Sequence, residues 1–386
     1  MNTPSATYCP APWISLTHLS DGEIRPCCQW DGGCDPDINF TNIKTDLLAG
    51  KELPGCLQCR LAEKAGAVSR RQELIEKYGV VTNSLIKILD MNFDNICNLK
   101  CRGCTSYSSH LWYADEQEIY GKTFIPTKYT ELNKYTELAD LNINISDIEE
   151  INVSGGEPFL SKNFDQFANK LFEEQNTIGN LFLNINTNGT VNPSAIVYKL
   201  MLEVKTLNVS VSIDGLAELN QYFRHGTDFN KCIEILELFK KLKIERQEKL
   251  TNLQIHTTVT IYNVNLLESI DTFFQENYPE FNKTHRLLYW PNSMCIRNIP
   301  LDLKEKLKPI VETYGEQYTD VKNELNNQGE DLFDEFVNFH NTLDTRRNES
   351  LRTANPMLFD YINSCKNNTQ KDNRVLLLKQ MSAFYK

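Results

Sequence analysis

The chain has 386 residues and a formal net charge of −11 at pH 7, with 41% hydrophobic residues. A chain of this length can bury a substantial core and predicts one large α/β domain with an appendage. The acidic balance argues against a general binder of nucleic acid or anionic membranes. Because no apolar run approaches the roughly 18 residues of a membrane span and residues 1–7 lack the features of a signal peptide, we expect a cytoplasmic protein.

Cysteines are concentrated near the N-terminus. Six of the twelve lie within the first 59 residues, namely Cys9, Cys27, Cys28, Cys34, Cys56 and Cys59. In a reducing compartment such density favours metal ligation over disulfides. Residues 20–23 predict the turn of a hairpin, and residues 57–78 predict a helix that stops at Gly79.

From residue 85 onward, strand-like runs alternate with helical patterns. The expected strands are 85–93, 150–154, 181–187, 206–213, 253–261 and 286–290. The expected helices are 164–174, 193–203, 229–246 and 265–276, with one long or two short helices inside 107–147. Strands joined by crossover helices imply a parallel sheet, and six strands are too few to close an eight-stranded barrel.

Cys97, Cys101 and Cys104 follow the first of these strands at C-x3-C-x2-C spacing. Three thiolates are one fewer than an ordinary structural zinc site or a saturated [4Fe–4S] cluster requires. The triplet therefore suits a cubane cluster with one iron open to a substrate or cofactor. A zinc knuckle with a distant fourth ligand, or three buried cysteines acting as small hydrophobes, are the alternatives that spacing leaves open.

Gly155-Gly156-Glu157-Pro158 comes directly after the second expected strand. Together with the cysteine triplet, this segment resembles the radical S-adenosylmethionine (SAM) enzymes, whose signature places the two motifs after the first and second strands. The resemblance implies a partial (β/α)6 barrel that holds a [4Fe–4S] cluster and SAM. It also implies reductive cleavage of SAM to a 5′-deoxyadenosyl radical, which abstracts hydrogen from a substrate.

The resemblance further implies a set of SAM contacts at the strand ends. These candidates are Gly155, Gly156, Glu157, Asn188, Ser212, Asp214, Arg224 and Val259. Arg224 is expected to fork onto the SAM carboxylate, and Ser212 and Asp214 to hydrogen-bond the ribose hydroxyls and the amino group. Ordinary strand-ending turns, a surface arginine and a core valine are the alternatives.

The N-terminal cysteines resemble an auxiliary cluster domain of the same family. Cys9-x12-Gly22-x4-Cys27 is similar to the opening of the SPASM and twitch motifs, and Cys56-x2-Cys59 completes the implied four-thiolate set. Cys28 competes with Cys27 for one position, and a four-cysteine zinc site is the alternative. In other members this domain usually follows the barrel, whereas here it precedes it.

Four protein thiolates leave no open iron in a second [4Fe–4S] cluster. Such a cluster is expected to relay an electron, which favours oxidation or cross-linking of a peptide or small-molecule substrate. The expected partner is an external reductant such as flavodoxin or ferredoxin. Methyl or sulfur transfer to RNA and a non-enzymatic zinc scaffold are the alternative functions. The acidic charge argues against RNA.

We expect three regions along the chain. Residues 1–80 form the SPASM/twitch-like segment, residues 81–300 the partial barrel, and residues 301–386 a helical C-terminal region. The C-terminal region resembles the tail of uncharacterised relatives with the same N-terminal cysteine arrangement, and it is placed to close the open side of the barrel.

Overall fold

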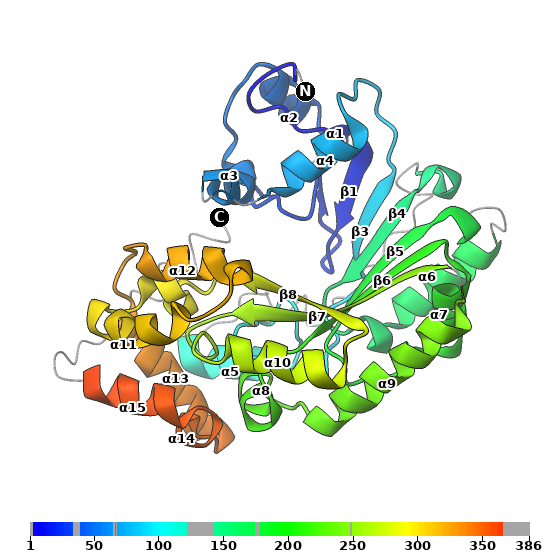
Figure 1. Cartoon of the computed structure of the whole chain (residues 1–386). Coiled ribbons are helices and arrows are strands. Elements are labelled where there is room, and N and C mark those ends of the chain that lie inside the picture. The colour runs from blue at the N-terminus through cyan, green and yellow to red at the C-terminus, as the bar shows by residue number, and fades with distance from the viewer. Residues whose placement is uncertain are drawn as a thin grey trace.

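The computed structural model describes residues 3–33, 39–64, 66, 68–121, 143–173, 178–247 and 249–365. Its centre is an eight-stranded sheet with the order β2-β1-β3-β4-β5-β6-β7-β8 (Figure 1). The strands are β1 (Ser15–His18), β2 (Ile24–Arg25), β3 (Ile88–Asn92), β4 (Glu150–Ser154), β5 (Phe182–Thr187), β6 (Thr206–Ser212), β7 (Leu250–Val259) and β8 (Phe281–Leu287). β1 and β2 pair antiparallel, and the other neighbouring strands pair parallel.

Four crossover helices cover one face of the sheet (Figure 1). They are α6 (Lys162–Glu173), α7 (Ala195–Glu203), α9 (Phe229–Glu245) and α10 (Leu267–Asn277). Alternate residues of each strand, such as Leu183 and Ile185 of β5, pack with these helices in one apolar core. This alternation places the intervening polar residues on the opposite face.

The opposite face of the sheet is polar. The Asn152 side-chain amide donates to Asp90 Oδ1 at 2.9 Å, and the Asn184 amide donates to Asn152 Oδ1 at 2.5 Å. Bonding between neighbouring strands satisfies these partly buried amides without apolar packing. We call this polar face the inner face of the sheet, and the face packed against the crossover helices the outer face.

The expected fold class is confirmed. The sheet is open, because β2 and β8 are its two ends, and the six parallel strands β3 to β8 are those of a partial barrel. Five expected strands lie within a few residues of the observed ones. The sixth is shifted, because β8 spans Phe281–Leu287 rather than 286–290. Its polar Asn282-Lys283-Thr284-His285 run gives no clear alternation, and only its two end residues are buried.

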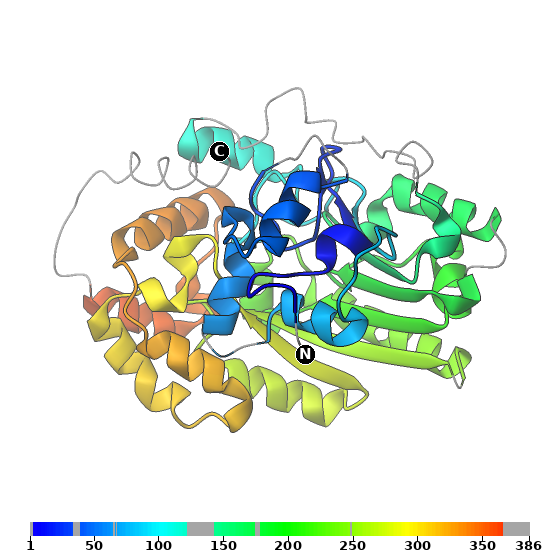
Figure 2. The same cartoon turned by 90° about the horizontal axis from the view of Figure 1, so that it is seen from above.

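The N-terminal segment extends the sheet beyond β3. The expected hairpin is confirmed, with β1 paired to β2 and also in parallel to β3. The single helix expected over 57–78 is wrong, because α3 (Leu57–Lys64) and α4 (Arg70–Tyr78) are separate. Ser69 caps α4 by accepting from the Gln72 N–H, so a new helix begins there. Helices α1 (Ala11–Ile14) and α2 (Thr41–Leu48) complete the segment, which lies over the sheet in Figure 2.

The C-terminal region is helical, as expected, in its described part. It comprises α11 (Leu301–Val311), α12 (Thr319–Asn326), α13 (Phe333–Arg347), α14 (Leu351–Ala354) and α15 (Pro356–Cys365). With α5 (Trp112–Tyr120) and α8 (Ala217–Phe223), these helices share a second apolar core. Cys34, residues 122–142 of the expected 107–147 helices, and residues 366–386 lie outside the described residues. None of the described helices has the length and apolar character that crossing a membrane requires.

We expect Phe164→Ala to lower the free energy of unfolding by about 3–5 kcal/mol, the usual cost of removing a buried phenylalanine. Phe164 is fully buried on α6 and stacks on Phe93 at 5.4 Å between ring centroids. Denaturant unfolding measures the loss. Phe172→Ala on the same helix is the control, because Phe172 is only partly buried, and an equal loss in both variants would contradict the prediction.

Candidate metal centre and cofactor site

The cysteine triplet lies in the loop that follows β3. Cys97 is buried, and Cys101 and Cys104 are half-buried. Burial and the charge of Cys101 raise the pKa of Cys97 to about 12, and burial with the charges of both other thiols raises the pKa of Cys104 well above its usual value. The three sulfurs are therefore close enough to influence one another. Thiols with such pKa values need a cation to become thiolates at neutral pH.

Nitrogen donors surround these sulfurs. The Asn188 side-chain amide lies 3.8 Å from Cys97 Sγ, and Arg224 Nη1 lies 3.9 Å from Cys101 Sγ. The Arg224 charge opposes the rise that burial causes in the pKa of Cys101. In the described part of the chain, no group of three or more His, Cys, Asp or Glu side chains is arranged to hold a metal ion. A cubane cluster differs, because its thiolates bind separate iron atoms, and three thiols with these donors fit one.

The loop is held in shape by the turn that follows α8. The backbone N–H of Lys100 donates to the His225 carbonyl at 2.9 Å, and that of Arg102 donates to the Phe223 carbonyl at 2.8 Å. The Trp112 indole N–H donates to the carbonyl of the second cysteine at 2.9 Å. Contacts with protein groups therefore hold the loop in shape.

Gly155 and Gly156 allow the end of β4 to contact the segment before the first cysteine. Gly155 has a φ of 114°, a conformation that favours glycine. A Cβ on Gly156 would stand 2.1 Å from the Ile96 carbonyl oxygen, and the Gly156 N–H donates to the Asp94 carbonyl at 3.2 Å. Close packing of the backbone is therefore a sufficient reason for glycine at both positions.

Glu157 joins the ends of β4 and β5. Its carboxylate accepts from Thr187 Oγ1 at 2.8 Å, from the Asn188 N–H at 2.7 Å and from the Phe159 N–H at 3.2 Å. Burial raises the pKa of Glu157 to about 7, although these bonds oppose the rise. Because Glu157 accepts the Asn188 N–H, it fixes the backbone at Asn188. Glu157 therefore orients Asn188, whose side-chain amide faces Cys97.

Asp214 and Arg224 form an ion pair beside the triplet. Asp214 Oδ2 lies 2.8 Å from Arg224 Nε, while Asp214 Oδ1 accepts from the Thr258 N–H at 2.7 Å. Arg224 therefore spans Asp214 and Cys101 rather than lying on the surface. Ser212 is half-buried at the end of β6, and Val259 packs in the second core.

The four N-terminal cysteines of the implied ligand set also influence one another. Burial and the charges of Cys56 and Cys59 raise the pKa of Cys9 to about 12. The pKa of Cys27 rises through burial and the charges of Cys28, Cys9 and, more weakly, Cys59. Cys9, Cys27 and Cys56 also pack around one apolar cluster, so three separate stretches of chain bring these thiols into one region.

Cys28 belongs to different surroundings. The residue is exposed overall, but its thiol is shielded, and this burial raises the pKa of Cys28. The nearby charge of Asp90 adds to the rise and that of Arg70 opposes it. Cys27 is therefore the better partner for the other three thiols.

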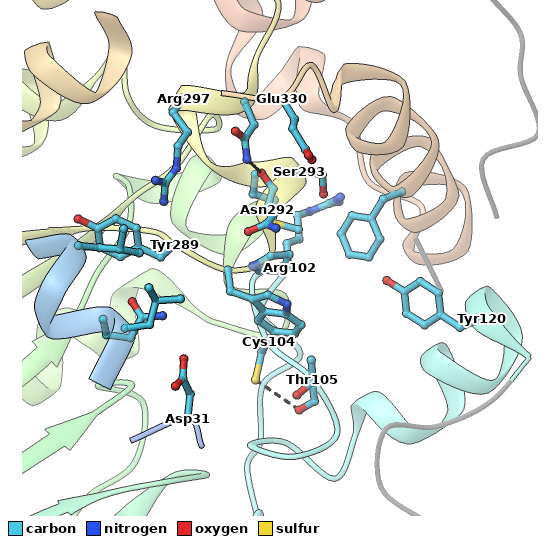
Figure 3. A pocket seen from close by; sticks show the side chains of 18 of the residues that line it. Asp31, Arg102, Cys104, Thr105, Tyr120, Tyr289, Asn292, Ser293, Arg297 and Glu330 are labelled. Atoms are coloured by element: carbon cyan, nitrogen blue, oxygen red, sulfur yellow. Dashed lines mark hydrogen bonds between the residues drawn. The ribbon is translucent and has the colours of Figure 1, made fainter. Parts of the chain in front are cut away.

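A cavity of about 640 Å³ lies between the triplet, the N-terminal segment and the C-terminal region (Figure 3). Cys104 and Trp112 line it on one side, and Asp31 and Leu57 line it from the N-terminal segment. Residues 289–294, which follow β8, form a further wall. Sequence patterns did not reveal this cavity, because its walls come from segments far apart in the chain.

Sequence patterns also gave no role to Arg102. Its side chain has no exposed area, although it stands between two cysteines of the triplet. It pairs with Asp344 and Glu349 at 2.6 and 2.7 Å. The only sequence signal was a charged residue inside a metal-ligand motif.

Residues 91–271 match the family model described as the Radical SAM superfamily. The chain carries a radical SAM domain. Such a domain implies a [4Fe–4S] cluster and SAM, and it indicates an enzyme. The matched residues contain the triplet and the ends of β4, β5, β6 and β7, whereas the N-terminal cysteine segment lies outside them.

Solved structures give further similarities. Native anSMEcpe with bound AdoMet is 22% identical, over 63% of this chain and 63% of that chain, with a TM-score of 0.37, so the match spans less than two thirds of anSMEcpe. SuiB of Streptococcus suis bound to the precursor peptide SuiA is 13% identical, over 91% and 78% of the two chains, with a TM-score of 0.35. TYW1 with a lysine-pyruvate adduct bound is 12% identical, over 59% and 74%, with a TM-score of 0.31. No curated protein matches the sequence.

We expect Gly156→Ala to lower the free energy of unfolding by about 1–3 kcal/mol, as overpacking usually does, and to reduce iron loading after anaerobic reconstitution. The added methyl group would displace the Ile96 carbonyl and with it the segment that leads to Cys97. Gly179→Ala is the matched control, because a Cβ there meets nothing within 4 Å. Equal iron loading in the two variants would contradict the prediction.

Proposed function

We propose that the protein cleaves SAM reductively and abstracts hydrogen from a peptide or small-molecule substrate bound in the cavity beside Cys104. The observation that carries the proposal is the triplet, gathered at the end of β3 with the donors Asn188 and Arg224, inside the matched radical SAM domain. In this proposal Cys97, Cys101 and Cys104 hold a [4Fe–4S] cluster. When reduced, that cluster supplies the electron that splits SAM into methionine and a 5′-deoxyadenosyl radical.

The side chains around the triplet bind and orient SAM in this proposal. The guanidinium of Arg224 has five N–H donors, and it contacts Asp214 and Cys101 through two of its nitrogens, so it retains donors for a carboxylate. Asp214 fixes the guanidinium by pairing with it. Ser212 lies at the neighbouring strand end, where the residue is partly exposed and its hydroxyl can bond a ribose hydroxyl.

The substrate site follows from the cavity. A volume of about 640 Å³ is within the usual range of roughly 300–1,000 Å³ for ligand pockets. Trp112, Tyr289 and Leu57 give it apolar walls, which exclude water from a reactive species. Because Cys104 lines one end, a substrate in the cavity lies next to the proposed cluster.

We assign the N-terminal cysteines to a second [4Fe–4S] cluster. Helix α3 carries Cys59, and Leu57 and Leu61 of the same helix line the cavity. A substrate radical formed there is therefore close to an electron acceptor, which favours oxidation or cross-linking. An external reductant such as flavodoxin or ferredoxin supplies the first electron in this scheme.

Replacing any one of Cys97, Cys101 and Cys104 with Ala should abolish formation of 5′-deoxyadenosine in dithionite-reduced, reconstituted protein, because the cluster loses a ligand. Chromatographic quantification of deoxyadenosine and methionine is the measurement. Cys365→Ala is the control, since Cys365 is also half-buried but lies on α15. SAM cleavage at the wild-type rate in the triple variant would exclude this assignment.

Anaerobically purified protein should contain about eight irons per chain, four for each cubane. The Cys56→Ala, Cys59→Ala double variant should retain about four irons and still cleave SAM. Cys28→Ala should retain all of them, because Cys28 is exposed and is not in the proposed ligand set. One zinc and about four irons in the wild-type protein would replace the second cluster with a zinc site.

A further inference from the structure

Arg102 is a fully buried charge in the cysteine loop, with partners that lie far along the chain. Arg102 Nη2 lies 2.6 Å from Asp344 Oδ1 and 2.7 Å from Glu349 Oε2, and Nε donates to the Tyr222 carbonyl at 3.0 Å. The guanidinium carbon also lies 3.7 Å from the centre of the Tyr222 ring. One side chain thus joins the triplet, α8 and the C-terminal region.

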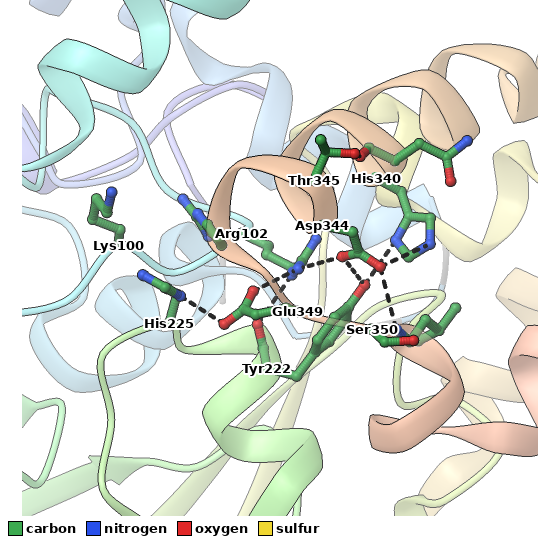
Figure 4. A network of polar contacts seen from close by, with 12 residues as sticks. Lys100, Arg102, Tyr222, His225, His340, Asp344, Thr345, Glu349 and Ser350 are labelled. Atoms are coloured by element: carbon green, nitrogen blue, oxygen red, sulfur yellow. Dashed lines mark hydrogen bonds and ion pairs between the residues drawn. The ribbon is translucent and has the colours of Figure 1, made fainter.

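Both carboxylates that meet Arg102 are fixed by further contacts (Figure 4). Asp344 accepts from the Tyr222 hydroxyl at 2.7 Å and from the Leu351 N–H at 3.2 Å. Glu349 Oε1 lies 2.6 Å from His225 Nδ1. His340 also faces this group, with Nε2 3.6 Å from Asp344 Oδ2. The carboxylates are therefore held in place on the C-terminal side of Arg102.

A second contact ties the same two segments together. Asp115 of α5 pairs with Lys100 of the cysteine loop and with Arg346 and Arg347 at the end of α13, each at 3.1 Å. The Arg347 guanidinium lies 4.8 Å from the centre of the Trp112 ring. The stretch from Asp344 to Glu349 therefore holds the loop through contacts on both sides of Cys101.

We propose that residues 344–349 form a clasp that positions the cysteine loop, with Arg102 as its positioning residue, and that the clasp sets the electrostatic surroundings of the triplet. The identity of the bound group rests on the proposed function, but the clasp itself is made only of protein contacts. Arg102 acts through the loop that carries Cys101 and Cys104. The C-terminal region is then part of the metal centre rather than an accessory.

Charge balance gives the proposal a signed consequence. Arg102→Met removes one positive charge and leaves the two carboxylates beside the loop without their guanidinium partner. Asp344→Asn and Glu349→Gln each remove one negative charge and leave Arg102 paired with a single carboxylate. The reduction potential of an iron–sulfur cluster depends on nearby charge and on hydrogen bonding around the sulfurs. The reduction potential should therefore become more negative in Arg102→Met and more positive in Asp344→Asn and in Glu349→Gln.

The experiment uses full-length protein reconstituted with iron and sulfide. We expect Arg102→Met to weaken iron retention against a chelator by about 10- to 100-fold, the usual cost of losing a group that orients a metal ligand. Arg102→Lys should recover part of this loss, because it keeps the charge but not the planar fork. Potentiometric titration followed by electron paramagnetic resonance should give potential shifts of opposite sign for Arg102→Met and Asp344→Asn.

Arg246→Met controls for a general loss of stability. Arg246 is also buried, but it bonds Thr251 at 2.7 Å and backbone carbonyls far from the triplet. If Arg246→Met weakens iron retention as much as Arg102→Met, or if both charge variants shift the potential in the same direction or not at all, the clasp is rejected.

A cluster-free measurement separates the clasp from the proposed function. In apoprotein, Arg102→Met should raise the rate at which a thiol reagent labels Cys104, as read by mass spectrometry, whereas Arg246→Met should not. If wild-type protein binds no cluster, the proposed function fails, and this labelling difference still decides the clasp. If the cluster forms and labelling is equal in the two variants, the clasp alone fails.

Discussion

The buried guanidinium of Arg102 is the constraint on which the cysteine loop depends. A charge with no exposed area is tolerated only when paired, and breaking such a pair commonly costs about 3–5 kcal/mol. Its partners Asp344 and Glu349 are 242 and 247 residues away in sequence. The loop therefore reaches its final shape only when the C-terminal helices have packed, and the local motif alone does not define the candidate metal centre.

The two faces of the sheet have different roles, because one packs in the core and the other carries polar side chains. The outer face supplies the apolar core, in which Leu183 and Ile185 pack against the crossover helices. The inner face carries neutral amides such as Asn152 and Asn184, bonded to one another. At the strand ends, these amides are followed by two further polar contacts, Glu157 with Asn188 and Asp214 with Arg224. The side chains of the candidate site therefore stand on strands that the crossover helices hold in place, which limits the freedom of the groups facing the triplet.

Short-range patterns in the sequence were sufficient for five of the six expected strands. The β4, β5 and β6 strands, the stop at Gly79 and the hairpin depend on neighbouring residues, and so were predictable. The break before α4 was missed because a helical pattern concealed the Ser69 cap. The role of Glu157 in orienting Asn188, the pairing of Arg102 and the cavity depend on contacts between distant segments, which no single-sequence pattern encodes.

The position of the N-terminal cysteine segment before the barrel has a simple physical basis. Because β1 pairs in parallel with β3, the segment joins the sheet directly beside the strand that delivers the triplet. Tyr107, just after the triplet, donates its hydroxyl hydrogen to Asp21 in the hairpin turn at 3.3 Å. The position of the segment in the chain therefore does not fix its position in space, since an added edge strand can pair beside β3 from either end of a barrel. The shared cavity follows from this pairing, because the same edge brings α3 opposite Cys104.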